Sequence, residues 1–251
     1  GKHDLNALLI YNQEQFNLNV ITGDASLDRL YASLPQRGQS FSGRMSYAFD
    51  NKYMAEFNFG YNGSENFAPK NRFGFFPSIA AGYNISMEPW FEPLLPVISY
   101  LKLRGSYGLV GNDRIGGQRF AYMSSINLTG AGFQTGIDMD NWKSGPVYNR
   151  YANYNLTWET GRKTNLGIDL HLFEDLKIVA DFFREDRENI FQQRGTIPNY
   201  LGTANTAVFA NTAAVRNQGF DFTLDYGKRF SKDLTVQMKG TFSFARNKVT
   251  K

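Results

Sequence analysis

The feature that most constrains this chain is a set of segments in which apolar and polar residues alternate. The clearest runs from Leu234 to Phe244, and the same pattern recurs over residues 53–61 and 101–109. Side chains of a strand point to opposite faces with period two, so each segment predicts a strand with one apolar and one polar face. Soluble strands average about five or six residues, whereas a tilted strand that crosses a bilayer needs about 9–11. The length of these segments therefore favours strands that cross a membrane.

The composition narrows the kind of membrane protein. Mean hydropathy is −0.42 and uninterrupted apolar runs are only a few residues long, so no transmembrane helix is predicted. Aromatic residues make up 16% of the 251 residues, and outer-membrane barrels carry aromatic girdles at both interfaces. The sequence predicts a β-barrel, with an aromatic-rich soluble β protein as the alternative.

Cysteine and charge exclude several functions. The chain has no cysteine, which excludes disulfides, thiol catalysis and cysteine metal sites. The net charge of +4 comes from scattered Lys and Arg, without a basic block, so no nucleic-acid partner is expected. The chain opens at Gly1 without a secretory signal, although an outer-membrane protein is made with one. We therefore expect this chain to be an internal piece of a longer polypeptide.

Short and long connections alternate between the expected strands. Tight turns are predicted where Asp and Asn favour turn conformations, at residues 50–52, 173–175 and 231–233. Long polar segments alternate with these turns, over about residues 13–39, 63–73, 111–155 and 191–217. Outer-membrane barrels have this asymmetry, with short periplasmic turns and long extracellular loops. A soluble meander has no reason for it.

The pattern predicts an all-β fold with nine spanning antiparallel strands. Their expected ranges are about 4–12, 40–49, 53–62, 74–87, 100–110, 158–172, 176–188, 220–229 and 234–246. Pro77 is unusual within a strand, because proline cannot donate a hydrogen bond to the ladder. Residues 88–99 are expected to form a short helical or irregular connection. An extra short hairpin strand is expected near residues 119–127. Nine strands do not close a single-chain bacterial barrel, which has an even number. An open edge in lipid would leave backbone groups unsatisfied, so these strands are expected to form part of a larger wall.

One segment carries a specific family pattern. Residues 100–113 read YLKLRGSYGLVGND, which resembles the LKLR-x-SYG-x-x-GN stretch of the SusC/RagA family of TonB-dependent outer-membrane transporters. Further segments are similar to this family in the same order, at residues 72–78, 156–159, 165–169, 181–190, 217–221 and 244–247, with a looser match at 211–215. Together they cover most of residues 39–251.

The resemblance implies a fold and a set of partners. It implies a barrel of roughly 22 strands in a Gram-negative outer membrane, of which residues 1–251 form part of one barrel domain, without the plug and the terminal strands. It implies a SusD-like surface lipoprotein as lid, energy from the TonB complex through the absent plug, contact with outer-membrane lipid, and oligosaccharide or peptide cargo. No cofactor is implied.

An enzymatic site is not predicted. The two histidines are His3 and His171, and His171 is expected beside Asp169 on a polar face, in a hydrogen-bonding role. No metal-ligand spacing occurs. Carboxylates at residues 185–188 alternate with arginines, which predicts a solvated ion-pair patch in preference to an acid/base pair.

Two groups of residues are candidates for function. Aromatic, amide and charged side chains of the long central segment suit contacts with sugars or peptides: Asn112, Asp113, Arg114, Trp142, Tyr148, Tyr151 and Tyr154. Polar positions of the strands are expected to face the barrel lumen: Arg44, Glu56, Asn58, Lys102, Arg104, Asp169, Lys177, Asp181, Asp221, Asp225 and Lys239. On the lipid side a Lys or Arg would cost about 2–4 kcal/mol at the bilayer midplane.

The residues leave alternatives to import open. The loop aromatics could instead order a long loop or meet the lid protein. A non-transporting barrel, or a soluble β-sandwich carbohydrate-binding module, would share the strand alternation. An outer-membrane enzyme would require a catalytic constellation inside the lumen, and the sequence shows none.

Overall fold

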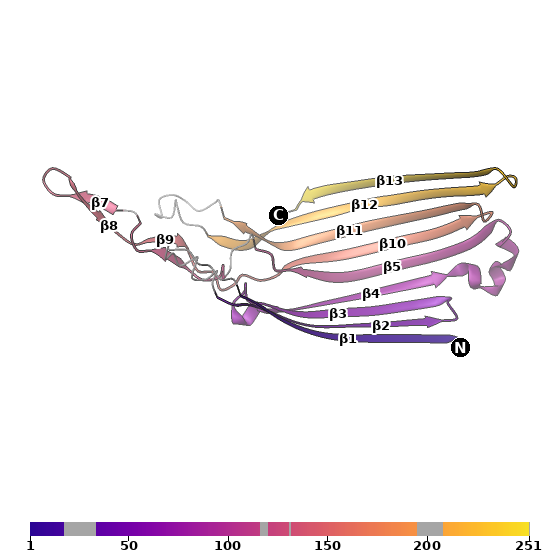
Figure 1. Ribbon diagram of the computed structural model, residues 1–251, viewed down its shortest axis with the longest axis horizontal. Coiled ribbons are helices and arrows are strands. Elements are labelled where there is room, and N and C mark those ends of the chain that lie inside the picture. Colours follow the sequence, from indigo (N-terminus) through magenta and orange to yellow (C-terminus); the bar gives the residue numbers. More distant parts are fainter. Residues whose placement is uncertain (18–33, 116–119, 131, 195–207, 251) are drawn as a thin grey trace.

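A computed structural model describes residues 1–17, 34–115, 120–130, 132–194 and 208–250 of the chain. Within them, nine long strands lie side by side in one antiparallel sheet, in the order β1-β2-β3-β4-β5-β10-β11-β12-β13 (Figure 1). Their bounds are β1 His3–Phe16, β2 Gln36–Phe49, β3 Tyr53–Ser64, β4 Phe73–Asn84, β5 Ile98–Asn112, β10 Glu159–Leu172, β11 Leu176–Gln193, β12 Phe209–Arg229 and β13 Thr235–Val249. The expected all-β, nine-stranded antiparallel sheet is confirmed, and it is open, with β1 and β13 at its edges.

The strands are long enough to cross a bilayer. The shortest have 12 residues and β12 has 21, against the about 9–11 that a tilted spanning strand needs. A β-sandwich would pack a second sheet over the apolar face. In the described part of the chain, the other sheets are only the two-stranded hairpins β6 (Ser125–Asn127) with β9 (Val147–Arg150), and β7 (Gly132–Thr135) with β8 (Asn141–Ser144). The sandwich alternative is therefore wrong.

Connections at the two ends of the sheet differ as the sequence predicts. Asp50 and Asn51 have φ of 53° and 52°, and Phe173 and Glu174 have φ of 53° and 61°. Pairs of left-handed residues make the tight turns that match the twist of a hairpin. These turns and that between β12 and β13 lie at one end, here the short-turn end (Figure 1). The opposite end, here the loop end, carries the hairpins β6–β9 and β7–β8.

Several strands extend farther toward the loop end than the sequence predicts. The ends of the expected loop at 191–217 are wrong, because β11 continues to Gln193 and β12 starts at Phe209; residues 195–207 of that loop lie outside the described part. In the same way, β1 continues to Phe16 and not to Asn12. Both faces of these extensions carry polar side chains, so the period-two signal that marks a half-apolar strand is lost there.

Pro77 accounts for an irregularity in the sheet. It lies within β4 opposite Phe59 of β3, whereas the pairing of β4 with β5 begins only at Ser78. Proline cannot donate to a ladder, and it stands where the β5 side of β4 becomes unpaired. β4 then ends at Asn84 instead of the expected 87, and two 3-10 turns follow, at Ile85–Met87 and Pro89–Leu94. The expected helical or irregular connection is confirmed.

A small hydrophobic core lies where the strands meet the long segments at the loop end. Phe67 and Leu156 are fully buried, and Trp158 packs on Phe67 and Phe76 with ring centroids 5.4 and 5.2 Å apart. A Cβ on Gly111 would come within 2.0 Å of the Phe76 ring, so only glycine leaves room for that ring. This core anchors the segment that leads from β5 to β10.

The extra strand expected near residues 119–127 is shorter than predicted. It is β6, Ser125–Asn127, and Arg119 lies outside the described residues. None of the helices in the described ranges is long and apolar enough to span a membrane.

Candidate functional site

One face of the sheet is apolar across all nine strands. The strand registers connect a single row of directly opposed residues: Leu5, Tyr47, Ala55, Ala81, Gly105, Leu166, Phe182, Phe220 and Phe244. Leu166 and Phe182 remain 58% and 48% exposed. A continuous apolar surface of this extent is far from what a soluble monomer exposes. We call this side the apolar face, and the other side the polar face.

All eleven residues expected in the lumen lie on the polar face. The next row along the strands contains Arg104, Gly167, Asp181 and Asp221, each directly opposite the next. The register places Arg44, Glu56, Asn58, Lys102, Asp169, Lys177, Asp225 and Lys239 at positions of the same parity. The sequence alternation and the sheet register therefore agree on one polar surface.

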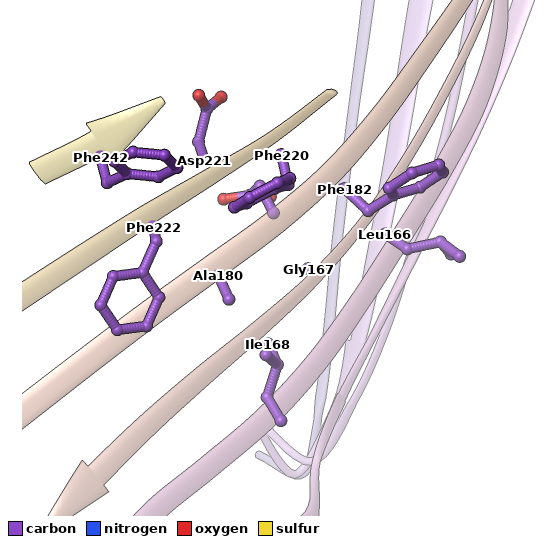
Figure 2. Close-up of a pocket in the computed structure, with 10 residues that line it drawn as sticks. Leu166, Gly167, Ile168, Ala180, Phe182, Phe220, Asp221, Phe222 and Phe242 are labelled. Atoms are coloured by element: carbon purple, nitrogen blue, oxygen red, sulfur yellow. The ribbon is translucent and has the colours of Figure 1, made fainter. Parts of the chain in front are cut away.

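The two faces are visible at the level of single residues. Figure 2 shows Asp221 and Phe222, which follow each other in β12, leaving the strand in opposite directions. Phe222, with Leu166, Phe182 and Phe242, lines a shallow apolar hollow of about 470 Å³ on β10–β13. Few polar atoms line this hollow, so it suits hydrocarbon better than a polar cargo.

A charge network crosses three strands of the polar face. The Nη2 of Arg104 on β5 donates to Oδ2 of Asp181 on β11 at 2.6 Å, and its Nε donates to Oδ1 of Asp169 on β10 at 3.3 Å. The guanidinium passes over Gly167, the β10 residue between the two strands. Side-chain exposures of 34% for Arg104 and 18% for Asp181 show a half-buried network. It stiffens the polar face but presents no nucleophile or acid/base pair.

A second ion pair lies near the other edge of the sheet. Arg44 on β2 donates to Oε2 of Glu56 on β3 from both Nε and Nη2, at 3.1 and 2.5 Å. The Nδ2 of Asn58 donates to the other carboxylate oxygen at 2.8 Å. Three of the expected lumen residues thus form one hydrogen-bonded unit.

The seven loop candidates do not form a single site. Asn112 and Asp113 lie at the end of β5, where the Asn112 Oδ1 accepts from the Arg114 amide at 3.1 Å and the Asp113 carbonyl accepts from Asn66 at 3.0 Å. These bonds order the chain as it leaves the sheet. Their geometry is that of a turn, with the Arg114 side chain exposed.

The aromatic candidates lie farther from the sheet. Tyr148 and Tyr151 stack with centroids 4.9 Å apart, while Tyr154 contacts Tyr122 at 5.9 Å and is 56% exposed. Trp142 lies on β8, in the hairpin that extends farthest from the sheet (Figure 1), and is 59% exposed.

Sequence reasoning missed the asparagines that tie the loop end together. The Nδ2 of Asn211 donates to the carbonyls of Thr157 and Asn189 at 2.9 and 2.7 Å, and its Oδ1 accepts from the Thr157 amide at 3.0 Å. Asn153 donates to the Phe209 carbonyl at 2.8 Å. A lone asparagine carries no periodic signal, so only the fold shows what it joins.

The charged groups weighed as catalytic candidates have structural partners. Arg187 pairs with Glu185 at 3.1 Å and with Glu159 at 3.4 Å. The ring of His171 packs against Tyr100 with centroids 4.8 Å apart. Among the described residues, no group of three His, Asp or Glu side chains is arranged to hold a metal.

Comparison with known proteins identifies similar sequences among TonB-dependent receptors. A family model described as TonB dependent receptor-like, beta-barrel matches residues 2–251. TonB-dependent receptor P3 of Formosa agariphila is 29% identical over 214 residues, which are 84% of this chain and 20% of that protein. TonB-dependent receptor SusC of Bacteroides thetaiotaomicron is 28% identical over 217 residues, 84% of this chain and 21% of SusC. The chain thus spans about a fifth of these relatives.

Solved structures agree on the fold. The RagAB peptide importer in its open-open state superposes with a TM-score of 0.75 at 22% identity, over 100% of this chain and 28% of the matched chain. The siderophore receptor PirA from Pseudomonas aeruginosa gives 0.55 at 16% identity, over 98% of this chain and 40% of PirA. The expected resemblance to SusC and RagA is confirmed, and the chain belongs to the TonB-dependent receptor-like β-barrel family.

Proposed function

We propose that residues 1–251 form part of the barrel wall of an outer-membrane importer of the SusC and RagA type. The observation that carries the proposal is the apolar row that crosses all nine strands, with charged networks on the opposite face. Only a structure between hydrocarbon and water needs both surfaces on strands of this length. On this proposal, the apolar face contacts lipid, and the polar face, which includes the eleven expected lumen residues, lines the lumen.

The whole domain is larger than this sheet. Strands β1 and β13 each leave one backbone edge unpaired in the described sheet, and such an edge is costly in lipid. We therefore propose that all 251 residues belong to one barrel domain of roughly 22 strands, completed by the remainder of a longer protein. That remainder would include the plug that couples to TonB.

The proposed activity is active import of oligosaccharides or peptides together with a SusD-like surface lipoprotein. Support comes from the family membership and from the likeness in fold to a peptide importer. The exposed aromatic rings on the loop side, Trp142 and Tyr154 among them, suit sugar faces and peptide side chains. The mechanism is binding and gating without covalent chemistry.

Two measurements test the proposal. Affinity purification of the full-length protein from outer membranes, followed by denaturing electrophoresis and intact mass, should give a polypeptide several times the 28.5 kDa of this chain together with a lipoprotein partner. Uptake of labelled oligosaccharides and labelled peptides should then be compared in cells with and without this protein and TonB. Uptake of oligosaccharides or of peptides that requires both this protein and TonB supports the import proposal. Uptake that is unchanged when either protein is removed contradicts it.

A further inference from the structure

The apolar face carries a group of charges immediately beyond its aromatic row, at the loop end. Two and four residues past Phe182, Phe220 and Phe244 on the same face, the strand registers bring together two rows of three side chains from β11, β12 and β13. They are Arg184, Asp186, Arg216, Gln218, Arg246 and Lys248, here the basic patch. The patch thus holds four cations and a single carboxylate.

Within the basic patch, Arg184 and Arg216 share one carboxylate, and a further cation lies opposite Arg216. Asp186 accepts from Arg184 Nε at 2.7 Å and from Arg216 Nε at 2.5 Å. Lys248 lies directly opposite Arg216, and Arg246 directly opposite Gln218, although like charges directly opposite each other on a sheet repel. An anion placed between β12 and β13 would remove this repulsion.

The side chains of the basic patch leave room for such an anion. Arg216, Gln218, Arg246 and Lys248 surround a hollow of about 250 Å³, and the Arg216 side chain is 41% exposed. Guanidinium groups bind phosphate oxygens through paired, charge-assisted hydrogen bonds, and lysine adds a point charge. The hollow therefore has the size and donor set for a phosphate group.

The position of the basic patch next to the aromatic row indicates which molecule supplies the phosphate. The aromatic row of Phe182, Phe220 and Phe244 is the last apolar level before the basic patch, and Phe220 contacts Phe244 with centroids 5.8 Å apart. Aromatic rings sit at the level of the headgroups in barrels of this class. On the proposed function, on which this inference rests, the patch faces the membrane plane at the outer-leaflet headgroups and not the lumen.

We propose that Arg216, Arg246 and Lys248 bind a phosphorylated saccharide headgroup of an outer-leaflet glycolipid. The acyl chains of the same lipid would then lie along the apolar hollow between Leu166 and Phe242, which is nearer the bilayer centre on β10–β13. One lipid would thereby contact both surfaces, and annular lipid would be held against β12 and β13.

The test uses full-length protein in detergent micelles and fluorescent lipopolysaccharide as the probe. The double variant Arg246→Gln, Lys248→Gln should weaken binding at least about tenfold, since it removes two charge-assisted contacts to phosphate. The matched control Lys228→Gln, Lys232→Gln makes the same charge change at the short-turn end and should bind as the parent does. The charge-keeping variant Arg246→Lys, Lys248→Arg should retain most of the affinity.

Further measurements distinguish a lipid phosphate from free inorganic phosphate, and the lipid-binding inference from the import proposal. Enzymatically dephosphorylated lipopolysaccharide should bind the parent as weakly as intact lipopolysaccharide binds the Gln variant, and millimolar inorganic phosphate should not displace the probe. Equal binding by parent and Gln variant, or displacement by inorganic phosphate, would overturn the inference. TonB-dependent uptake is measured in the same variants: if uptake is absent from the parent while the probe binds, only the import proposal fails.

Discussion

Arg104 and Asp181 form an ion pair across the full width of the strand that separates them. The Nη2–Oδ2 distance is 2.6 Å, and the side chain of Arg104 crosses β10 directly above Gly167. A Cβ at residue 167 would lie 2.6 Å from Cζ of Arg104 and 2.7 Å from Oδ1 of Asp181. The glycine is therefore required by the ion pair, and not by any turn in the backbone.

Gly167→Ala should destabilise the full-length barrel by about 1–3 kcal/mol, the range for an overpacked site. Urea unfolding in micelles, followed by heat-modifiable electrophoresis, measures the loss. Gly227→Ala is the matched control on the same face, since the nearest atom to its Cβ is 3.9 Å away. The double variant Arg104→Ala, Gly167→Ala should lose less than the sum of the two single changes, because the clash is gone. Strict additivity would count against this explanation.

The carboxylate of Glu88 makes part of the stability depend on pH. It accepts from Tyr53 Oη at 2.6 Å, Tyr83 Oη at 2.9 Å and Lys52 Nζ at 3.2 Å. The hydrogen bond from Tyr53 is the main cause that holds the pKa of Glu88 below its ordinary value of 4.5. A depressed carboxylate pKa stabilises the fold at pH above 4.5, and this contribution is lost as the pH falls through the lowered value.

Glu88→Gln should therefore be less stable than the parent at neutral pH, and the difference should shrink as the pH falls below 4.5 and through the lowered pKa of Glu88. The measurement is urea unfolding at a series of pH values. Glu92→Gln, on the neighbouring exposed 3-10 turn, controls for loss of a negative charge. A difference that stays constant to the most acid pH at which the parent remains folded would show that ionisation of Glu88 is not responsible.

Asn211 joins the start of β10 to the irregular end of β11. Asn211→Ala should increase hydrogen exchange at the Thr157 amide, which donates to Asn211 Oδ1 at 3.0 Å. Asn211→Asp keeps this acceptor but loses both Nδ2 donors, so it should protect the amide better than alanine does. Asn127→Ala removes a side-chain oxygen that accepts from Thr129 in its own turn, and it should leave Thr157 unchanged. Equal exchange in Asn211→Ala and the parent would contradict the assignment.

Adjacent residues of β13 test the polarity of the two faces. Phe242→Arg places a cation on the apolar face and should cost up to about 2–4 kcal/mol, depending on its depth in the bilayer. Thr241→Arg places the same cation on the polar face and should be nearly neutral. Phe242→Leu separates loss of the ring from gain of the charge. Equal destabilisation by the two arginines in a folding assay with vesicles would contradict a lipid-facing Phe242.

The sequence predicts the middle of each strand better than its ends. Between Leu234 and Phe244 one face is apolar and the other polar, so the period-two pattern follows the environment residue by residue. Past Arg187 in β11 and before Val215 in β12, apolar and polar residues no longer alternate, and the same backbone continues without that signal. The strand extensions are set by cross-strand pairing, which a single sequence does not display.

The sequence likewise predicts only part of each candidate site. Residues such as Arg104 and Asp181 could be assigned to one face from parity alone, but their contact across Gly167 depends on the register of three strands. Residue type alone points to the loop residues Trp142 and Tyr154, and they lie in different places because β8 and the turn at Tyr154 belong to separate parts of the loop end. Residue type without a register predicts what a side chain can bind, but not what lies beside it.

The most direct test of the account is a spin-label scan along β12. Single cysteines would be placed at residues 220 to 224 of the full-length protein, after replacement of any cysteine outside residues 1–251, and labelled in lipid vesicles. Collision with lipid-soluble oxygen and with a water-soluble nickel chelate would then be measured at each position. A lipid-facing apolar face predicts high oxygen access at Phe220, Phe222 and Leu224, and high nickel access at Asp221 and Thr223. Nickel access without alternation would contradict the membrane-spanning wall.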